Sequence, residues 1–493
     1  MSAPPSADGA VAPPRSPGLS KVATGIAGLD EVTLGGLPRG RTTLVAGAAG
    51  AGKSLFGIEF LVRGARDLGE PGVLMSFEES RDELVENVSS MGYDVEQLER
   101  DGLLVVDAVR VDRTQFIETG GFDLEGLFLR LGAAVDQIGA TRVTLDTIEV
   151  LFSALGNEAI IRAELSRLFR WLKDRGLTTV VTGERGRAGE MTRFGIEEYV
   201  SDCVIVLDHR VDQEISTRRL RVVKYRGSLH GTNEYPFLIT ATGLVVVPIT
   251  SLGLDYAAPR ERLSTGIDEL DEMVDGGIYR ASTLLVGGGA GTGKTSICAH
   301  VAAAACARGE KVVFFSLEES PAQLTRNMGS IGIDLQKWMD AGQLRMASVR
   351  ATASGLEEHL ANLRAELDDL RPSLVVLDAL ASLGRVGTTH ELSSIIARDL
   401  DLLRSRGITT VLTALTPEDQ SAATDGAVAS LVDAWVQLRN HQHAGARVRL
   451  LSVVKMRGSR HSDKVRELRF TDQGAVLQDS TVAAGRHEGD DRT

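Results

Sequence analysis

The stretch TTLVAGAAGAGKS (residues 42–54) decides the fold, and a second stretch, TLLVGGGAGTGKT (residues 283–295), repeats it. Each is a short apolar run followed by the pattern G-x-x-x-x-G-K-[ST], which is typical of a loop that wraps the phosphates of a nucleotide. Glycines let successive backbone N–H groups approach the phosphates where a Cβ would block them. Both loops lead into a helical pattern, whose N-terminal dipole favours an anion. The two stretches therefore predict two nucleotide-binding P-loops.

Each residue type in the two loops has a separate expected role in binding a triphosphate. We expect the glycines to shape the backbone, a lysine to contact the β- and γ-phosphates, and the final hydroxyl to bind Mg²⁺. The nucleotide-binding residues predicted in this way are Gly47, Gly50, Gly52, Lys53, Ser54, Gly288, Gly291, Gly293, Lys294 and Thr295. ATP and Mg²⁺ are accordingly the expected cofactors.

Four further blocks recur in the same order after the two loops, so the chain is an internal duplication. The four pairs are LMSFEES (74–80) with FFSLEES (314–320), RVTLDTIEVL (142–151) with LVVLDALASL (374–383), EYVSDCVIVL (198–207) with ASLVDAWVQL (429–438), and VVKYRGSLH (222–230) with VVKMRGSRH (453–461). Five collinear blocks, the P-loops included, make a chance match implausible.

Within each copy, short β-branched runs alternate with helical periods. TTLVAG (42–47), VLMSF (73–77) and TTVVTG (178–183) are typical of buried strands, and EAIIRAELSRLFRWLKDRG (158–176) is typical of an amphipathic helix. This alternation predicts an α/β fold with a mainly parallel sheet flanked by helices. Ligands of such a fold bind at the carboxyl ends of its strands.

A segment with Pro, Gly and little periodicity, PITSLGLDYAAP (248–259), separates the two copies. We expect a disordered Pro/Ala/Ser-rich leader, two domains in series and a disordered polar tail. The predicted ranges are 1–18 for the leader, 19–259 for the first domain, 260–480 for the second domain and 481–493 for the tail.

Composition favours a globular chain and excludes several classes of protein. Of the 493 residues, 43% are apolar and 25% are charged. No uncharged apolar run reaches the length of about 18 residues that a membrane span needs. The N-terminus lacks a signal-peptide pattern, so the cytoplasm is the expected location. The three cysteines have no metal-ligand spacing, and we expect buried thiols. A net charge of −13 argues against a nucleic-acid partner.

Two acidic pairs, Glu78-Glu79 and Glu318-Glu319, each follow an apolar run directly. They should therefore lie at the carboxyl ends of strands, level with the phosphates. A carboxylate beside the γ-phosphate can orient or deprotonate the attacking water or hydroxyl. We favour Glu78 and Glu318 as that catalytic base, with Glu79 and Glu319 assisting.

The serine after each pair supports a second interpretation of these acids. Ser80 with Glu83, and Ser320 with Gln323, form the capping-box pattern, and Pro321 suits the first helical position. An acid next to such a cap can serve only to stabilise the N-terminus of the helix.

Asp146 and Asp378 end the apolar runs RVTLD and LVVLD. A carboxylate that emerges from a buried strand beside the P-loop strand suits a water-mediated contact to Mg²⁺. The predicted metal residues are therefore these two aspartates and the loop hydroxyls of Ser54 and Thr295. The alternative is that each aspartate caps the next helix.

A basic segment recurs far from each loop, and its residues are Lys224, Arg226, His230, Lys455, Arg457 and His461. One interpretation is a solvated hairpin. The other is a set of cations presented to the γ-phosphate of a neighbouring subunit, as an arginine finger is. The second interpretation requires a ring, because a heterologous interface repeats until it closes. The pattern alone leaves both open.

These motifs together resemble the KaiC family of circadian-clock ATPases and autokinases, which are built from two RecA-like domains. The resemblance runs from about Lys21 to Asp479 and includes TGIxxLDE, both P-loops, both xEES blocks, EYPFLIT and both KxRGSxH segments. It implies two tandem RecA-like P-loop NTPase domains in a homohexamer, with ATP held between subunits. It also implies that the six basic residues reach a neighbour's nucleotide and that the first domain is a slow ATPase.

In the family, the second domain transfers phosphate to an adjacent Ser-Thr pair in the pattern Ser-Thr-x-x-Asp. The matching positions here are Ala429-Ser430-Leu431-Val432-Asp433, so the first acceptor is missing and the second is serine. The resemblance then implies autophosphorylation at the single site Ser430, with Glu318 as base. The longer C-terminal segment on which KaiA acts is reduced here to a short polar tail. KaiA is therefore not an expected partner, whereas a KaiB-like or signalling partner is compatible with the sequence.

Three functions fit these observations. The leading hypothesis is a Mg²⁺-dependent ATPase with serine autokinase activity, acting in clock-like or signalling regulation. The second is a recombinase-like DNA-binding ATPase, for which the sequence shows no basic, Gly-rich DNA loop. The third is an ATP-gated hexameric scaffold with little turnover.

Overall fold

A computed structural model gives the fold of the chain in two compact units, residues 1–250 and 251–493, termed here the first and second domain. The predicted leader apart from Gly18, the predicted tail and residues 249–257 of the predicted boundary lie outside the described residues. The structure describes residues 18–109, 125–152, 158–186, 200–212, 215–248, 258–350, 355–385, 389–416, 430–443, 446–472 and 474–480.

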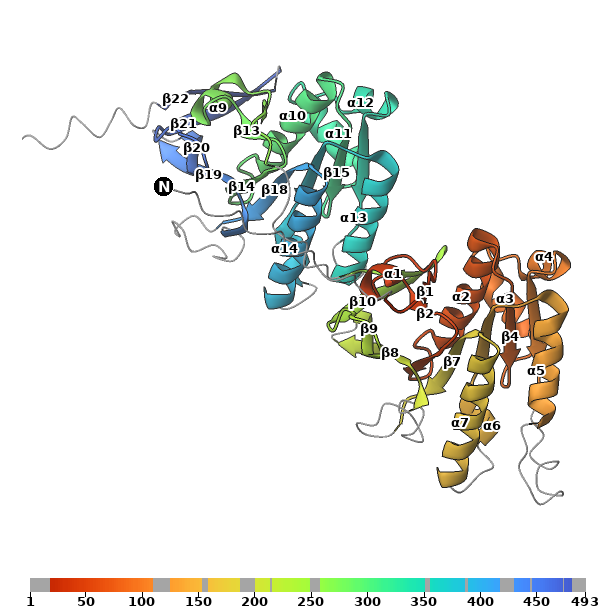
Figure 1. Ribbon diagram of the computed structural model, residues 1–493. Helices are drawn as coiled ribbons and strands as arrows, with labels where there is room; N and C mark the ends of the chain where they lie inside the picture. The colour runs from red at the N-terminus through yellow and green to blue at the C-terminus, as the bar shows by residue number, and fades with distance from the viewer. Residues whose placement is uncertain are drawn as a thin grey trace, which may run out of the picture. The chain divides into compact units, whose positions relative to one another are not determined.

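The first domain is built on a nine-stranded sheet in the order β11-β10-β9-β8-β3-β7-β6-β4-β5 (Figure 1). Strands β3 to β8 are parallel to their neighbours, and β9, β10 and β11 extend the sheet as antiparallel strands. The strands are β3 (Thr42–Gly47), β4 (Gly72–Ser76), β5 (Leu104–Ala108), β6 (Arg142–Asp146), β7 (Thr178–Glu184), β8 (Cys203–Asp212), β9 (Ile215–Tyr225), β10 (Glu234–Thr240) and β11 (Gly243–Val246). The runs predicted as buried strands are thus β3, β4 and β7.

Helices cover both faces of this sheet, because its strands are apolar on both sides. In β4, Leu74 belongs to the core with the helix that follows the P-loop, whereas Val73 and Met75 belong to the core on the other face. A two-stranded sheet, β1 (Lys21–Val22) with β2 (Leu37–Pro38), lies outside the main sheet. The helices are α1 (Leu29–Val32), α2 (Lys53–Leu68), α3 (Arg81–Ser89), α4 (Val95–Arg100), α5 (Glu125–Ile138), α6 (Ile148–Phe152) and α7 (Glu158–Asp174).

The second domain repeats this architecture with the strand order β22-β21-β20-β19-β14-β18-β17-β15-β16. A small sheet of β12 (Arg262–Leu263) and β13 (Ile278–Tyr279) again accompanies the main one. Its strands are β14 (Thr283–Gly288), β15 (Val312–Ser316), β16 (Leu344–Ser348), β17 (Leu374–Asp378), β18 (Thr409–Leu415), β19 (Ala434–His443), β20 (Ala446–Met456), β21 (Arg466–Thr471) and β22 (Gly474–Asp479). Its helices are α9 (Asp268–Met273), α10 (Lys294–Ala307), α11 (Pro321–Gly329), α12 (Gln336–Asp340), α13 (Leu356–Leu370), a 3-10 helix (Leu380–Arg385) and α14 (Thr389–Ser405).

The structure confirms the predicted α/β class with two mainly parallel sheets. The three cysteines, Cys203, Cys298 and Cys306, are buried free thiols, as their spacing predicted. Among the described helices, none combines the length and the apolar character needed to span a bilayer.

Candidate functional site

The first P-loop connects the end of β3 to the start of α2. Gly50 and Gly52 have φ values of +73° and +97°, which side chains disfavour. A Cβ built on Gly47 would lie 2.8 Å from the carbonyl oxygen of Leu207, so the loop also needs glycine for space. The Lys53 side chain folds back over the loop, and its Nζ donates to the carbonyl oxygen of Ala48 at 3.0 Å.

The second P-loop has the same geometry. Gly291 and Gly293 have φ values of +70° and +100°. Lys294 Nζ donates to the carbonyl oxygens of Gly288 (2.9 Å) and Gly289 (2.8 Å). Burial lowers the pKa of Lys294, although the negative charges of nearby acidic groups act in the opposite direction. Both predicted lysines are therefore buried, with each ammonium group bonded to carbonyl oxygens of its own glycine-rich loop.

The predicted acidic pair of the first domain lies at the carboxyl end of β4. Glu78 accepts a hydrogen bond from Thr147 Oγ1 at 3.2 Å. Glu79 accepts one from Asn87 Nδ2 at 3.3 Å. Burial raises the pKa of Glu79, and the negative charge of Asp146 adds to this rise. The pair and Asp146 thus form one cluster of carboxylates at the ends of β4 and β6. The expectation that the aspartate-bearing strand lies next to the P-loop strand is wrong, because β7 lies between β6 and β3, as β18 lies between β17 and β14.

The second domain places its pair in the same way at the end of β15. Glu318 accepts a hydrogen bond from Ser382 Oγ, and Glu319 accepts one from Asn327 Nδ2 at 2.8 Å. In each domain, one acid is therefore bonded to a hydroxyl beyond the aspartate-bearing strand. The other acid is bonded to an asparagine of the following helix.

The capping-box predictions are confirmed in both domains. Ser80 caps α3 and Ser320 caps α11, each with reciprocal bonds to the residue three positions later. Glu79 and Glu319 lie just before these caps. Helix capping and a place in the carboxylate cluster therefore coexist at these positions.

The predicted metal aspartates end the strands β6 and β17 and are buried. Asp146 accepts a hydrogen bond from Thr182 Oγ1 of β7, and Asp378 accepts one from Thr413 Oγ1 of β18 at 2.5 Å. Burial raises the pKa of Asp378, and a hydrogen bond from Thr295 of the P-loop lowers it in part. The two groups predicted to hold Mg²⁺ in the second domain, Thr295 and Asp378, are thus close enough for one to affect the pKa of the other. The described residues contain no cluster of three or more His, Cys, Asp or Glu side chains suited to a metal.

The basic segments lie at the edge of their own sheet opposite to their own P-loop. In the first domain, Lys224 at the end of β9 pairs with Val204 near the start of β8, which is parallel to β3. The backbone N–H of Arg226 donates to Asp202, whose own N–H donates to Thr42, the first residue of β3. The P-loop begins at the other end of β3, five residues away, or roughly 17 Å along an extended strand.

The second domain repeats this placement with closer contacts. Lys455 Nζ donates to the carbonyl oxygen of Val432 at 2.7 Å. Arg457 Nη2 donates to the carbonyl oxygen of Ser430 at 2.7 Å, and its Nη1 lies 3.6 Å from Asp433 Oδ1. Burial lowers the pKa of Lys455, and the positive charge of Arg457 adds to this effect. Ser430, the predicted acceptor, is exposed at this edge, whereas Ala429 lies outside the described residues.

The remaining basic residues occupy the same edge. The His230 ring stacks on Tyr225 of β9 with a centroid separation of 6.2 Å, and His461 is exposed after β20. The structure therefore brings Lys224, Arg226 and His230 together in the first domain and Lys455 and Arg457 together in the second, with His461 four residues further along the chain. Neither group lies beside the P-loop of its own domain.

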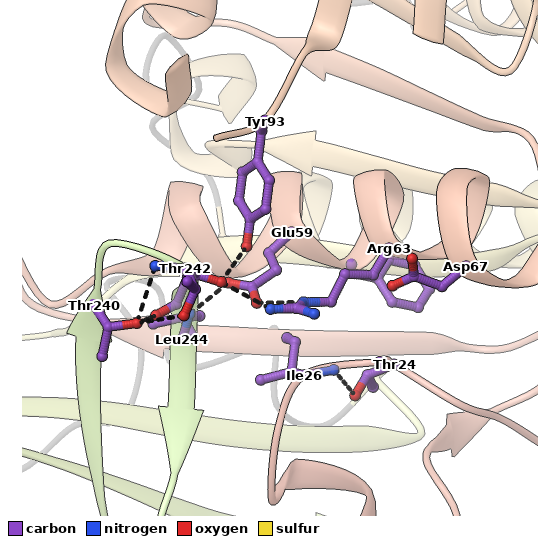
Figure 2. Close-up of polar contacts among 12 residues, drawn as sticks. Thr24, Ile26, Glu59, Arg63, Asp67, Tyr93, Thr240, Thr242 and Leu244 are labelled. Carbon is purple, nitrogen blue, oxygen red and sulfur yellow. Dashed lines mark hydrogen bonds and ion pairs between the residues drawn. The ribbon is translucent and has the colours of Figure 1, made fainter. Parts of the chain in front are cut away.

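A polar network that the sequence did not predict fixes the turn between β10 and β11 to α2 (Figure 2). Glu59 accepts the N–H of Leu244 at 2.7 Å and pairs with Arg63, whose Nε lies 2.6 Å from Glu59 Oε1. Arg63 and Tyr93 both donate to the carbonyl oxygen of Thr242, at 2.9 and 3.3 Å. Burial and the charge of Glu59 raise the pKa of Tyr93 to about 12, so its hydroxyl stays a donor.

Sequence reasoning also missed the hydroxyl partners of the acids. Thr182 and Thr413 occupy the same place in the repeated runs TTVVTG and TTVLTA, so alignment of the two copies could have identified them. Thr147 and Ser382 occupy different places in their blocks, and no pattern common to the two copies marks them.

These observations define the class of the protein. Each domain has a P-loop near the middle of a mainly parallel sheet, with carboxylates at the ends of the second and third strands from the P-loop strand. This arrangement is that of a P-loop ATPase of RecA-like fold, present here twice in one chain.

The chain belongs to the KaiC family, since the family model for the KaiC ATPase matches residues 22–251 and 263–482. It is 48% identical over 472 residues to "Circadian clock protein KaiC2" of Synechocystis sp., covering 95% of this chain and 83% of that protein. It is 35% identical over 466 residues to "Circadian clock oscillator protein KaiC" of Synechococcus elongatus, covering 94% and 90%. The KaiC of Parathermosynechococcus lividus is also 35% identical, over 467 residues, with 94% and 86% covered.

Proposed function

We propose that this KaiC-family ATPase is Mg²⁺-dependent and works as a homohexamer whose ATP sites lie between subunits. The observation that carries the proposal is the opposite placement of P-loop and cations in both domains. Arg226 and Arg457 are held to residues that adjoin the first residue of the P-loop strand, at the far edge of the sheet from its loop. Cations at that edge do not lie beside the triphosphate site of their own domain, so they are placed to contact the site of a neighbouring subunit, and a head-to-tail contact of this kind can close into a ring.

The residues present fit ATP and Mg²⁺. The glycine-shaped loops offer backbone N–H groups, and Lys53 and Lys294 supply a positive charge to the β- and γ-phosphates. In the second domain, Thr295 and Asp378 would hold Mg²⁺, which neutralises charge on the phosphates, and the hydroxyl of Thr295 is close enough to Asp378 to lower the pKa of that carboxyl. Glu318 would orient or deprotonate the attacking hydroxyl, as Glu78 would do for water in the first domain.

We also propose that the second domain phosphorylates Ser430. This serine is exposed, and Arg457 and Lys455 hold the backbone around it at the edge that would face a neighbour's triphosphate. A role in clock-like regulation agrees with the names of the relatives. We further propose that the protein acts in the cytoplasm with a KaiB-like or signalling partner.

Separate Lys53→Ala and Lys294→Ala variants test the ATPase proposal. Each should abolish the hydrolysis of its own domain, so the two residual rates should differ and the double variant should be inactive. Unchanged ATP hydrolysis in both single variants would refute the enzymatic function and leave the scaffold.

Subunit mixing tests the shared site. A Lys53→Ala chain and an Arg226→Ala chain, each with Lys294→Ala to silence the second domain, should regain activity when mixed into hybrid rings. No recovery in rings whose mixing is verified by native mass spectrometry would argue that each site is complete within one chain.

Phosphate transfer is tested by intact-protein mass spectrometry after incubation with ATP and Mg²⁺. We expect one phosphate, located on Ser430, and its loss in Ser430→Ala and Glu318→Gln. Phosphate that persists in Ser430→Ala would identify a different acceptor.

A further inference from the structure

Each domain holds its basic segment against the small two-stranded sheet that accompanies the main one. In the first domain, the backbone N–H of Gly231, directly after His230, donates to the carbonyl oxygen of Val32 at 2.9 Å. In the second domain, the N–H of Ser462 donates to the carbonyl oxygen of Met273 at 2.8 Å, and these two residues hold the corresponding positions. The C-terminal end of each segment is therefore fixed by the same backbone contact, at the end of the helix between the two short strands.

In the second domain, Arg262 and Tyr279 join the small sheet to the turn that follows Arg457. The two residues pair with each other across β12 and β13. Arg262 Nη2 donates to Ser459 Oγ at 2.6 Å, and the Tyr279 hydroxyl donates to the carbonyl oxygen of Gly458 at 3.2 Å. The guanidinium also lies over the Tyr279 ring, 4.3 Å from its centroid. Both residues after the cation are thus bonded to the small sheet.

The guanidinium of Arg262 is itself held in place. Its Nη1 donates to the carbonyl oxygens of Val274 (3.0 Å) and Gly277 (2.8 Å), and its Nη2 lies 3.3 Å from Asp275 Oδ2. The Ser459 hydroxyl donates to the same carboxylate oxygen at 3.0 Å. A guanidinium presents its donors in one rigid plane, so it can hold several acceptors at fixed positions at once. The turn therefore cannot shift without breaking these bonds.

The first domain makes an equivalent connection from the opposite side. Its tyrosine, Tyr225, lies within the basic segment, and the hydroxyl donates to the carbonyl oxygen of Gly36, just before β2, at 2.9 Å. Lys21 opens β1 as Arg262 opens β12, and its Nζ lies over the Tyr225 ring, 4.8 Å from the centroid. A cation on a tyrosine therefore joins the small sheet to the basic segment in this domain too.

The two tyrosines do not occupy corresponding positions. Pro38 of β2 holds the place of Tyr279, and Met456 of β20 holds the place of Tyr225. Both copies thus keep the contact although the tyrosine has changed sides. A contact that differently placed residues make in both copies is better explained by a need to fix the basic segment than by the packing of one particular side chain.

We propose that Arg262 and Tyr279 are positioning residues for Arg457, the cation presented to a neighbouring subunit's triphosphate. Lys21 and Tyr225 have this role in the first domain. The inference rests on the shared sites proposed above. A misplacement of about 1 Å at a reacting group can lower a rate roughly a hundredfold. Loss of these contacts should therefore slow the site to which the segment is presented and leave the P-loop of the same chain intact.

Mixing of altered chains separates positioning from support of the fold. The first chain carries Arg262→Ala, the second carries Lys294→Ala, and both carry Lys53→Ala to silence the first domain. Arg262→Ala alone should lower ATP turnover roughly ten- to a hundredfold. In hybrid rings, about one site in four joins the intact P-loop of the first chain to the intact segment of the second, so turnover should recover to roughly a quarter of the Lys53→Ala rate.

Two milder variants test the same role, including the case in which Arg262→Ala does not fold. Arg262→Lys installs the residue type of the first domain, and Tyr279→Phe loses only the hydroxyl that bonds to Gly458. Each should lower turnover by about two- to tenfold. Arg406→Ala, which removes an exposed pair with Asp368, is the matched control and should leave turnover unchanged.

Unchanged turnover in Arg262→Ala and Tyr279→Phe would overturn the inference. It would also be overturned if Arg262→Ala rings were not restored by Lys294→Ala chains while Arg457→Ala rings were, since the loss would then lie in the P-loop site of the altered chain itself. Native mass spectrometry verifies the mixing in both cases. If the Arg457→Ala mixture fails to recover as well, the shared sites are refuted and the positioning role falls with them.

Discussion

The two domains pack the helix that follows the P-loop against the sheet with different chemistry in the same place. In the first domain, the fully buried Arg142 donates to the carbonyl oxygens of Phe60 and Ala23, each at 2.8 Å, and pairs with Glu70. In the second domain, the corresponding position, four residues before the strand-end aspartate, is the buried Leu374.

The helix that packs against this position also differs between the two domains. A Cβ built on Gly64 would lie 2.5 Å from Arg142 Nε, so the first domain needs glycine there. The second domain has Ala305 at the corresponding position in its helix, eleven residues after the P-loop lysine. The same backbone is therefore supported by a buried, ion-paired arginine in the first domain and by apolar packing in the second. This comparison shows that the fold depends on filled volume and satisfied polar groups at this site, not on one residue type.

A second pair of positions teaches the same point. Glu59 in α2 accepts the N–H of Leu244, and its counterpart His300 in α10 faces the N–H of Ala475, with Nδ1 at 3.5 Å. The other ring nitrogen of His300 lies 2.9 Å from the carbonyl oxygen of Gly266. The first domain thus fixes its terminal hairpin with the ion pair of Glu59 and Arg63, and the second domain fixes its own with the ring of His300.

Removing the buried arginine of the first domain should have the largest effect on stability. Arg142→Ala removes a buried cation, leaves the two carbonyl oxygens without their donor and opens a cavity, so we expect a loss of about 3–5 kcal/mol in the stability of the first domain. Hydrogen exchange of the amides in α2, followed by mass spectrometry, measures this loss. The amides of α10 should be unaffected and serve as the internal control.

The matched double variant is Arg142→Leu with Gly64→Ala, which gives the first domain the apolar residue types that the second domain has at these positions. Because the leucine and alanine side chains refill the volume of the arginine, this double variant should recover the cavity part of the loss and keep only the cost of the two carbonyl oxygens that lose their donor, about 1–3 kcal/mol. A loss of stability as large as that of Arg142→Ala would mean that the apolar packing of the second domain cannot replace the buried arginine of the first.

Glu59→Ala should have the next largest effect. It leaves the N–H of Leu244 and the guanidinium of Arg63 without the carboxylate that each contacts, which should cost about 2–3 kcal/mol and loosen the turn between β10 and β11. Faster exchange of the amides in residues 240–246 would show this. Arg66→Ala, which removes an exposed pair with Asp67, is the control and should change exchange little.

The pH dependence of the second domain should follow His300. Burial lowers the pKa of this ring, so the folded state holds it neutral while the unfolded state binds a proton below about pH 6.5. The unfolded state then binds more protons, and stability falls with decreasing pH by at most about 1.4 kcal/mol per unit. His300→Gln should reduce the slope that α10 exchange shows between pH 7 and 5.5. An identical slope in this variant would assign the effect to other groups.

The helix caps should give the smallest and most equal effects. Ser80→Ala and Ser320→Ala each remove a capping box and should cost about 1 kcal/mol of local stability. Exchange at the first turns of α3 and α11 measures both. Because Pro321 already fixes the backbone at the start of α11, we expect the smaller loss there. A clearly larger loss at Ser320 would contradict this reasoning.

Local patterns predicted much of this molecule. The P-loops, the strands around them and both capping boxes depend on residues close in sequence, and all of them appear where they were expected. The duplication then carried each inference from one domain to the other.

The polar contacts between distant segments were not predicted. Glu59 and Leu244 are 185 positions apart, and the bond from Thr147 to Glu78 spans 69 positions. Periodicity reports which face of a helix is apolar, but not which buried polar group meets which backbone group. A buried arginine in a strand whose counterpart carries leucine is likewise invisible to an apolar pattern.

The distance between each phosphate loop and its own cations has a kinetic consequence. If the sites are shared, a single chain would carry two P-loops and two sets of basic residues, but no complete active site. Turnover per chain would then rise with protein concentration and level off once the rings are complete. The specific activity of a very dilute sample would therefore report assembly rather than chemistry.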